Sequence, residues 1–130
     1  MTITAAVDGS AIGNPGPSGW AWYIDDARWA AGGWSRGTNN KGELEAVRQL
    51  LRVTEQVCDS NGRPEDLEVF CDSQYVINSV TKWVHGWKKK GWKKSNGKPV
   101  LNVEQIKEIY ELLTRRRKSG AAVTFRWVKG

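Results

Sequence analysis

The N-terminal part of the chain carries three strand patterns in a row, and no helical pattern precedes them. Residues 2–8 alternate apolar and polar side chains, as a strand with one buried face does, and Asp8 lies near the end of this pattern. Gly and Pro cluster over 9–19 and predict a turn-rich loop. Two aromatic and polar stretches, about 19–28 and 29–37, predict antiparallel strands. Such a sheet needs helices from the rest of the chain to cover it.

The remainder of the chain alternates helical and strand patterns. The predicted elements are a helix from Gly42 to about Asp59, a strand over 67–72, a helix over about 74–83 that a lysine-rich segment interrupts, a helix that ends at Gly120 and a strand over 122–128. The predicted caps are Thr38, Asn39 and Asn40 for the first helix, Ser73 for the second, and a capping box of Asn102 with Gln105 for the third. We therefore predict an α/β fold, in which helices pack on a mixed sheet.

Length and composition exclude several classes of protein. One compact domain, residues 1–130, fits a mass of 14.6 kDa. The longest apolar run covers residues 20–24, far short of the roughly 20 residues that cross a bilayer. The N-terminus lacks the basic start and apolar run of a secretory signal, so we expect a cytoplasmic protein. Cys58 and Cys71 are expected to be free, buried thiols in a reducing compartment.

The positive charge is concentrated in residues 82–98, which we call the tryptophan–lysine segment. This segment holds seven of the 20 basic residues and none of the 14 acidic ones, so the rest of the chain is nearly neutral despite a net charge of +6. Trp83, Trp87 and Trp92 alternate with the lysines, a composition that suits a phosphate backbone and base faces. The alternative is a solvated loop. A second basic run, 115–118, ends a predicted helix, where cations favour the dipole, and we interpret it as structural.

Three acids lie at the ends of predicted elements. Asp8 ends the first strand, Asp72 ends the fourth and Glu43 starts the first helix. If the first and fourth strands are neighbours, the two aspartates meet at one sheet edge and repel each other unless a cation lies between them. Oxygen ligands favour a hard divalent cation, Mg²⁺ above all. The alternative is a capping role for each aspartate and a favourable first-turn position for Glu43.

Other catalytic arrangements find little support in the sequence. His85 is the only histidine, which leaves a Ser-His-Asp or Cys-His arrangement little to work with. The two cysteines have no paired ligands at zinc-finger spacing, and the glycine-rich loop does not fit G-x-G-x-x-G.

Five motifs resemble bacterial ribonuclease H type 1 in order and spacing. They are Asp8-Gly-Ser with Gly13-Asn-Pro-Gly-Pro, Thr38-Asn-Asn-Lys-Gly-Glu-Leu, Asp72-Ser-Gln-Tyr-Val, the tryptophan–lysine segment and the final Trp127-Val-Lys-Gly. The resemblance spans the whole chain. It implies a ribonuclease H-like α/β fold, whose five-stranded mixed sheet has three antiparallel strands followed by two parallel ones, with the tryptophan–lysine segment as a basic protrusion.

The resemblance also implies an activity. The family's enzymes are endonucleases that hydrolyse the RNA strand of RNA–DNA hybrids with two Mg²⁺ ions, or with Mn²⁺ instead. Asp8, Glu43 and Asp72 resemble three of the family's catalytic, metal-binding carboxylates. The residues that resemble substrate contacts are Asn14, Thr38, Asn39, Asn40, Gln74, Trp83, Trp87, Lys88, Lys89, Lys90 and Trp92. The implied partner is an RNA–DNA hybrid duplex, and no membrane is involved.

The sequence departs from the family pattern after Gly130, where it stops. In the family, a loop with a histidine and a helix with a fourth carboxylate follow this point. We therefore expect hydrolysis to be impaired while hybrid binding persists. The absent helix is also expected to uncover part of the sheet, and thereby to lower stability or to favour an assembly; otherwise we expect a monomer.

Two other interpretations stay open. A non-catalytic module that binds hybrid or duplex nucleic acid would use the tryptophan–lysine segment and would not need the carboxylates. A related metal nuclease of the same fold, such as a transposase or resolvase, is disfavoured, because those proteins lack the Thr-Asn-Asn…Glu and Trp-Lys-Lys features.

Overall fold

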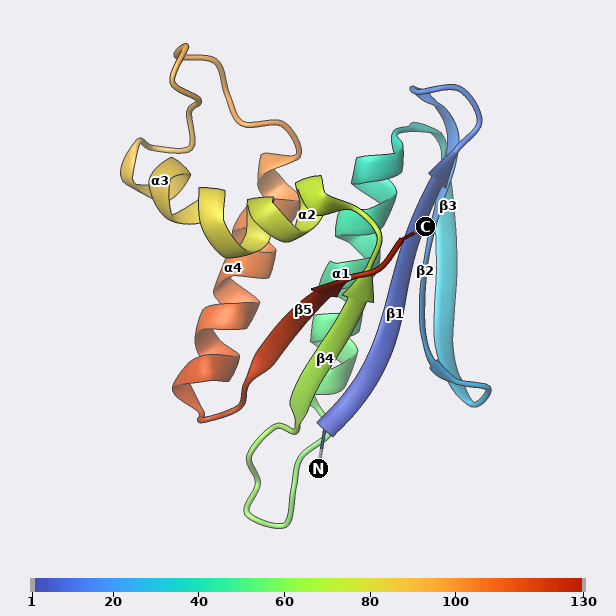
Figure 1. Ribbon diagram of the computed structural model, residues 1–130, viewed down its shortest axis with the longest axis vertical. Helices are drawn as coiled ribbons and strands as arrows, with labels where there is room; N and C mark the ends of the chain where they lie inside the picture. Colours follow the sequence, from blue (N-terminus) through green and yellow to red (C-terminus); the bar gives the residue numbers. More distant parts are fainter. Residues whose placement is uncertain (1, 130) are drawn as a thin grey trace.

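The computed structural model describes residues 2–129 (Figure 1). The strands are β1 (Thr2–Ala11), β2 (Gly16–Asp25), β3 (Arg28–Gly37), β4 (Asp66–Cys71) and β5 (Val123–Trp127). The helices are α1 (Asn39–Glu55), α2 (Gln74–Asn78), α3 (Val84–Lys89) and α4 (Val103–Lys118), and a π-helical turn, η1 (Ser79–Trp83), joins α2 to α3. No helix in this range is long and apolar enough to cross a membrane.

All five strands form one mixed sheet in the order β3-β2-β1-β4-β5. The β1–β2 and β2–β3 pairs are antiparallel, whereas β1–β4 and β4–β5 are parallel, which confirms the predicted fold class. The predicted loop over 9–19 is wrong in its extent. Strands β1 and β2 stay paired as far as Ala11 opposite Ser18, so the connection between the two strands covers only residues 12–15.

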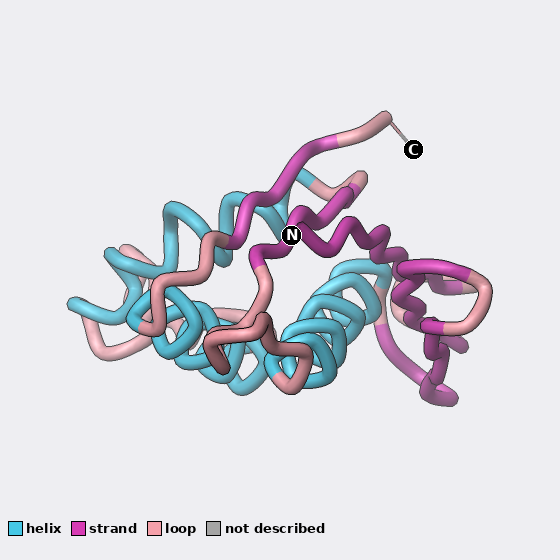
Figure 2. Tube along the Cα trace, turned by 90° about the horizontal axis from the view of Figure 1, so that it is seen from below, coloured by secondary structure: helices cyan, strands magenta, loops and turns pink. Residues whose placement is uncertain are grey.

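One face of the sheet is buried. Ile3, Ala5 and Val7 of β1 belong to the core, and the residues between them are exposed, as a strand with one covered face requires. Helices α1 and α4 lie against the buried face (Figures 1 and 2). On the opposite face of the described sheet, Tyr23 and Trp29 pair across β2 and β3 and are 47% and 60% exposed. An uncovered part of the sheet was expected to lower stability or to favour an assembly, and both effects stay predictions.

Helix α1 begins and ends earlier than the apolar pattern indicates. Thr38 is its cap, as predicted, because the Thr38 hydroxyl accepts a hydrogen bond from the Lys41 N–H at 3.1 Å. This bond starts the helix at Asn39 instead of Gly42, and the helix ends at Glu55. Residues up to Asp59 therefore lie beyond it.

The earlier end of α1 changes the position of one cysteine. Cys58 lies outside the helix, where it is exposed and pairs through an isolated bridge with Pro64. The prediction that both thiols are buried is therefore wrong for Cys58 and confirmed for Cys71, and both thiols are free, as expected.

The helix that starts after Ser73 does not stop at the tryptophan–lysine segment. The Ser73 hydroxyl accepts a hydrogen bond from the Val76 N–H at 3.2 Å, which confirms the predicted cap. The chain then stays helical through η1 to the end of α3 at Lys89. Val76, Val80 and Val84 are all buried, so the apolar stripe that holds α2 to the core continues into the basic segment and keeps it helical.

The predicted capping box at the start of α4 is wrong. Asn102 adopts a left-handed conformation with φ 56° and makes no capping hydrogen bond with its side chain. The Gln105 side chain turns to α1 instead, where its amide donates to the Lys41 carbonyl at 3.2 Å and to Glu45 Oε1 at 2.9 Å. Gln105 therefore ties α4 to the first turns of α1.

Two residues of the basic run at the end of α4 have structural roles, which agrees with the structural interpretation of this run. Arg116 is 1% exposed, and its guanidinium donates to the Thr54 hydroxyl and to the Glu65 carbonyl, both at 2.7 Å. Arg115 pairs with Glu55 on the surface at 2.8 Å. The end of α4 is thus fixed both to α1 and to the segment that leads into β4.

We predict that Arg116→Ala lowers the free energy of unfolding by about 3 kcal/mol, because it opens a cavity and removes two hydrogen bonds from buried partners. Arg115→Ala, which breaks an exposed ion pair, is the matched control and should cost no more than about 1 kcal/mol. Urea denaturation measures both values. Equal losses in the two variants would contradict the structural role assigned to Arg116.

Candidate metal-binding site

Three carboxylates meet where β1, β4 and α1 approach one another. Strands β1 and β4 run parallel and are paired up to Ala6 opposite Phe70, so Asp8 and Asp72 lie at the same end of this strand pair. The prediction that Asp8 ends its strand is wrong, because β1 continues beyond it and pairs with β2 as far as Ala11. Glu43 reaches the same end of the β1–β4 pair from the first turns of α1. One carboxylate oxygen from each of the three acids lies within 4.8 Å of the others. The predicted convergence of Asp8, Glu43 and Asp72 is present in the structure.

Two glycines allow α1 to come close enough to the sheet for this convergence. A Cβ atom on Gly9 would lie 2.3 Å from the Glu43 nitrogen, and a Cβ atom on Gly42 would lie 2.3 Å from the Gly19 carbonyl oxygen. No side chain fits at either position. Strand β1 and α1 therefore touch through their backbones, immediately beside Asp8 and Glu43.

The Glu43 carboxylate is held on both of its oxygens. Oε1 accepts a hydrogen bond from the Gly9 N–H at 2.8 Å, and Oε2 lies 3.1 Å from the Cys71 Sγ, in hydrogen-bonding contact. Glu43 is 2% exposed, whereas Asp8 and Asp72 are both exposed. Burial, reinforced by the charge of Asp72, raises the pKa of Glu43 to about 8 against the hydrogen bonds that lower it.

The donor set fits a hard divalent cation. The cluster offers oxygen ligands from three acids, and its single buried member is destabilised as an anion by desolvation and by a neighbouring negative charge. A cation among these oxygens would relieve both effects. The same three residues were predicted as metal ligands from their places at element ends.

Several of the predicted substrate contacts lie on the elements that carry the acids, or on segments that contact these elements. The Asn14 side chain accepts a hydrogen bond from the Asn39 N–H at 3.3 Å and so joins the β1–β2 connection to the start of α1. The Asn40 side chain accepts one from the Ser73 hydroxyl at 3.4 Å. Thr38 caps α1, and Gln74 is exposed at the first position of α2. These polar residues form a rim on the elements that carry the acids.

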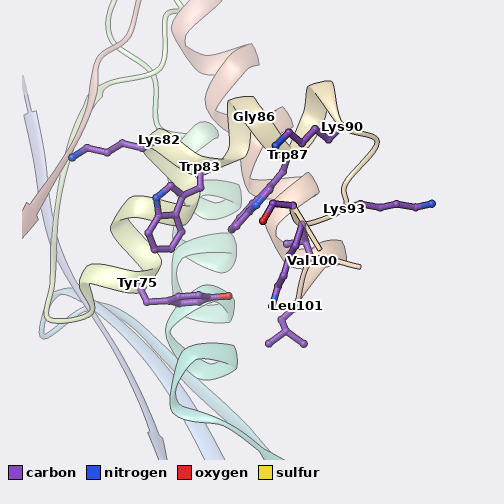
Figure 3. A pocket seen from close by; sticks show the side chains of 11 residues that line it. Tyr75, Lys82, Trp83, Gly86, Trp87, Lys90, Lys93, Val100 and Leu101 are labelled. Carbon is purple, nitrogen blue, oxygen red and sulfur yellow. The ribbon is translucent and has the colours of Figure 1, made fainter. Parts of the chain in front are cut away.

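A cavity of about 720 Å³ opens along α2, η1 and α3, and Figure 3 shows its lining. Tyr75, three residues after Asp72, starts an aromatic row that continues through Trp83 and Trp87, with ring centroids 6.0 and 5.9 Å apart. The lysines that line the cavity are Lys82, Lys90, Lys93 and Lys94. The cavity therefore combines flat aromatic rings with positive charge. In the sequence, its first ring follows Asp72 by three residues.

Other residues of the tryptophan–lysine segment lie elsewhere. Trp92 packs edge-on against Tyr110 of α4, with centroids 6.4 Å apart, and Lys107 lies over its ring. Lys88 also turns to Tyr110, with its Nζ 4.8 Å from the ring centroid. Lys89 is exposed on α3. Of the predicted aromatic and lysine contacts, the structure brings Trp83, Trp87 and Lys90 to the cavity. It does not bring Lys88, Lys89 and Trp92 there.

Three residues with a part in the site were not predicted from the sequence. Gly9 and Gly42 allow the close approach, and Cys71 contacts Glu43. A glycine within a strand or a helix would be a signal of close backbone approach, but the predicted loop began at Gly9 and the predicted helix at Gly42, which hid this signal. No signal existed for Cys71, since its contact depends on the rotation of α1 relative to β4.

The sheet order and the acidic cluster define an α/β protein with a candidate metal-binding site. Comparisons with known proteins identify its family. The family model for RNase H matches residues 1–130. Ribonuclease H of Tropheryma whipplei (strain Twist) is 54% identical over 114 residues, which cover 88% of this chain and 67% of that protein. Ribonuclease HI of Streptomyces coelicolor is 46% identical and covers 95% of this chain and 51% of that protein.

The chain belongs to the RNase H family, as the motifs indicated. The fold agrees. The structure of LC11-RNase H1 in complex with RNA/DNA hybrid superposes with a TM-score of 0.69 at 21% identity, over 97% of this chain and 84% of that one.

The raised pKa of Glu43 predicts how the metal-free protein responds to pH. Between the ordinary value of 4.5 and about 8, the folded state holds a proton that the unfolded state has lost, so the free energy of unfolding falls as pH rises through this range. The loss attributable to this group is on the order of 5 kcal/mol. Glu43→Gln should remove it, and should therefore be more stable than the parent at pH 9 in the presence of a chelator.

The neighbouring acid Glu45 provides a control of opposite sign. Burial raises its pKa, but hydrogen bonds from Arg48, Gln49 and Gln105 outweigh burial and lower it. Its stabilising effect is therefore present above pH 4.5 and is lost on acidification, so Glu45→Gln should destabilise the protein at pH 9. Thermal unfolding from pH 5 to pH 9 tests both variants. A Glu43→Gln variant that is less stable than the parent at pH 9 would contradict the account.

Proposed function

We propose that this chain is an endonuclease that hydrolyses the RNA strand of RNA–DNA hybrids at Asp8, Glu43 and Asp72, with bound divalent cations and Mg²⁺ above all. One observation carries the proposal: three carboxylates lie with oxygens within 4.8 Å of one another at the edge of an RNase H sheet. Relatives named ribonuclease H, and a neighbour solved as a complex with RNA/DNA hybrid, support the choice of substrate.

The cations would be held by the oxygens of these three acids. When bound in pairs, such ions activate a water molecule and stabilise the charge on the leaving oxygen. The chain itself supplies the geometry: Gly9 and Cys71 contact the buried Glu43, while the exposed Asp8 and Asp72 face the side from which a substrate arrives. Mn²⁺ has the same preference for oxygen ligands and is proposed as an alternative.

The polar rim and the cavity provide separate contacts for the two strands of a hybrid. Asn14, Asn40 and Gln74 are proposed to meet the 2′-hydroxyl groups that distinguish RNA from DNA, because Asn14 contacts the start of α1, Asn40 lies in that helix's first turn and Gln74 follows Asp72 closely in the chain. The cavity with Trp83 and Trp87 offers rings for stacking and lysines for phosphates, and we assign it to the DNA strand. Thr38 and Asn39, at the start of α1, are proposed as further contacts to the backbone of the nucleic acid. Lys88, Lys89 and Trp92 contribute to the same basic protrusion.

The proposal places the protein in the cytoplasm, where an exposed free thiol such as that of Cys58 stays reduced. The monomeric state stays a prediction.

The Asp8→Asn variant tests the catalytic role. We expect it to bind an RNA–DNA hybrid as the parent does and to lose cleavage by about a thousandfold, because one metal-binding charge contributes several kcal/mol of transition-state stabilisation. Glu111→Gln, at an exposed acid of α4, is the matched control and should cleave as the parent does. The measurement is strand cleavage with Mg²⁺ or Mn²⁺, together with hybrid binding by fluorescence anisotropy.

A non-catalytic binding module is the second candidate, because the lysine-lined cavity does not include the carboxylates and could hold a duplex without cleaving it. A parent chain that binds the hybrid and cleaves none of it with either metal would support this candidate. Cleavage by Asp8→Asn at the parent rate would contradict the assigned catalytic site.

A further inference from the structure

Cys71 is the last residue of β4 and directly precedes Asp72. Its side chain shares the inward face of the strand with Leu67 and Val69, and it is fully buried, whereas Asp72 is exposed. Strand β4 therefore directs a thiol inward and a carboxylate outward at the same corner of the site. The inward position brings the thiol to the first turns of α1.

The thiol has two oxygen acceptors within reach, and one is clearly closer. Sγ lies 3.1 Å from Glu43 Oε2 and 3.7 Å from the Ser73 carbonyl oxygen. A thiol has one proton to donate and is a weak donor, which favours the nearer oxygen on a carboxylate. The contact is closed to water, because both side chains are buried.

This contact complements the hydrogen bond that the neighbouring strand β1 donates to the same carboxylate. The Gly9 N–H of β1 holds Glu43 Oε1 at 2.8 Å, and the Cys71 thiol of β4 contacts Oε2. The carboxylate is thus fixed between two neighbouring strands. Each carboxylate oxygen has two lone pairs, so one on each oxygen stays available for a cation.

We propose that Cys71 is a positioning residue, whose thiol donates to Glu43 and fixes the orientation in which the Glu43 carboxylate binds a divalent cation; this inference rests on the proposed function. Without the thiol, Oε2 loses its hydrogen-bond partner. Only the hydrogen bond from the Gly9 N–H to Oε1 then restrains the carboxylate, which is free to rotate. The competing explanation is that Cys71 only fills space in the core. The two explanations make different predictions for substitutions that remove the hydrogen-bond donor of Cys71 but keep its side-chain volume.

The test uses three variants in a Cys58→Ser background, so that Cys71 carries the only thiol of the parent. Cys71→Ser keeps a donor, Cys71→Ala removes it and reduces the volume, and Cys71→Val removes it while filling the site. Mn²⁺ binding is measured by isothermal titration calorimetry at a temperature where circular dichroism shows all four proteins folded.

We expect Cys71→Ala and Cys71→Val to bind Mn²⁺ about tenfold more weakly than the parent, the lower end of the effect of removing a partner that orients a metal ligand. Cys71→Ser should stay within about threefold of the parent. Equal affinity in all four proteins would overturn the proposal, as would a loss in Cys71→Ala that Cys71→Val restores.

An infrared spectrum of the metal-free parent at pH 9, above the pKa of about 8 at which Glu43 loses its proton, provides a second readout that packing alone does not change. Donation to Glu43 should shift the S–H stretching band below that of the exposed Cys58 thiol, measured in a Cys71→Ser variant that retains Cys58. An unshifted band would overturn the hydrogen bond. Neither readout requires cleavage, so a chain that binds Mn²⁺ but does not cut the hybrid fails the proposed function and leaves the role of Cys71 standing. A parent that binds no Mn²⁺ overturns both.

Discussion

The site depends on the contact between two backbones at Gly9 and Gly42. A methyl group at either glycine would lie 2.3 Å from a backbone atom of a neighbouring element, so any side chain there would move α1 away from the sheet. Glu43 follows Gly42 directly, and its carboxylate accepts the Gly9 N–H. The approach of helix and strand and the position of the third carboxylate are therefore one structural feature.

This arrangement places negative charges where they oppose folding. Glu43 is buried beside another acid, and its pKa is raised for that reason. Contacts elsewhere hold the same elements in place: Gln105 ties α4 to the first turns of α1, and Arg116 ties it to Thr54 near the end of α1. Helix α1 is thus fixed over its length to α4, which leaves its first turns rigid enough to present an acid without a bound cation.

Much of this arrangement was predictable because it depends on local signals. Alternation predicted β1, and the acids at element ends predicted that Asp8, Glu43 and Asp72 converge if the first and fourth strands are neighbours. The make-up of the sheet was implied by the resemblance to the family. The caps Thr38 and Ser73 were also predicted, since a capping bond joins residues three apart in the chain.

The errors concern interactions between distant elements. Gln105 fits a capping box in the sequence, but its amide finds acceptors on α1, 60 and more residues away. The lysine-rich sequence beyond Trp83 did not predict a helix. The helix continues there because Val80 and Val84 pack against the core. The contact of Cys71 with Glu43 joins residues 28 apart and depends on the register between α1 and β4.

The three acids, brought together by a contact between backbones, are proposed to form one binding site for divalent cations. An anomalous difference map from a crystal of this chain soaked in Mn²⁺ would locate the bound ion. We expect a Mn²⁺ peak in contact with carboxylate oxygens of Asp8, Glu43 and Asp72. A map with no peak among these three residues, or with its strongest peak at another group of acids, would contradict the proposal.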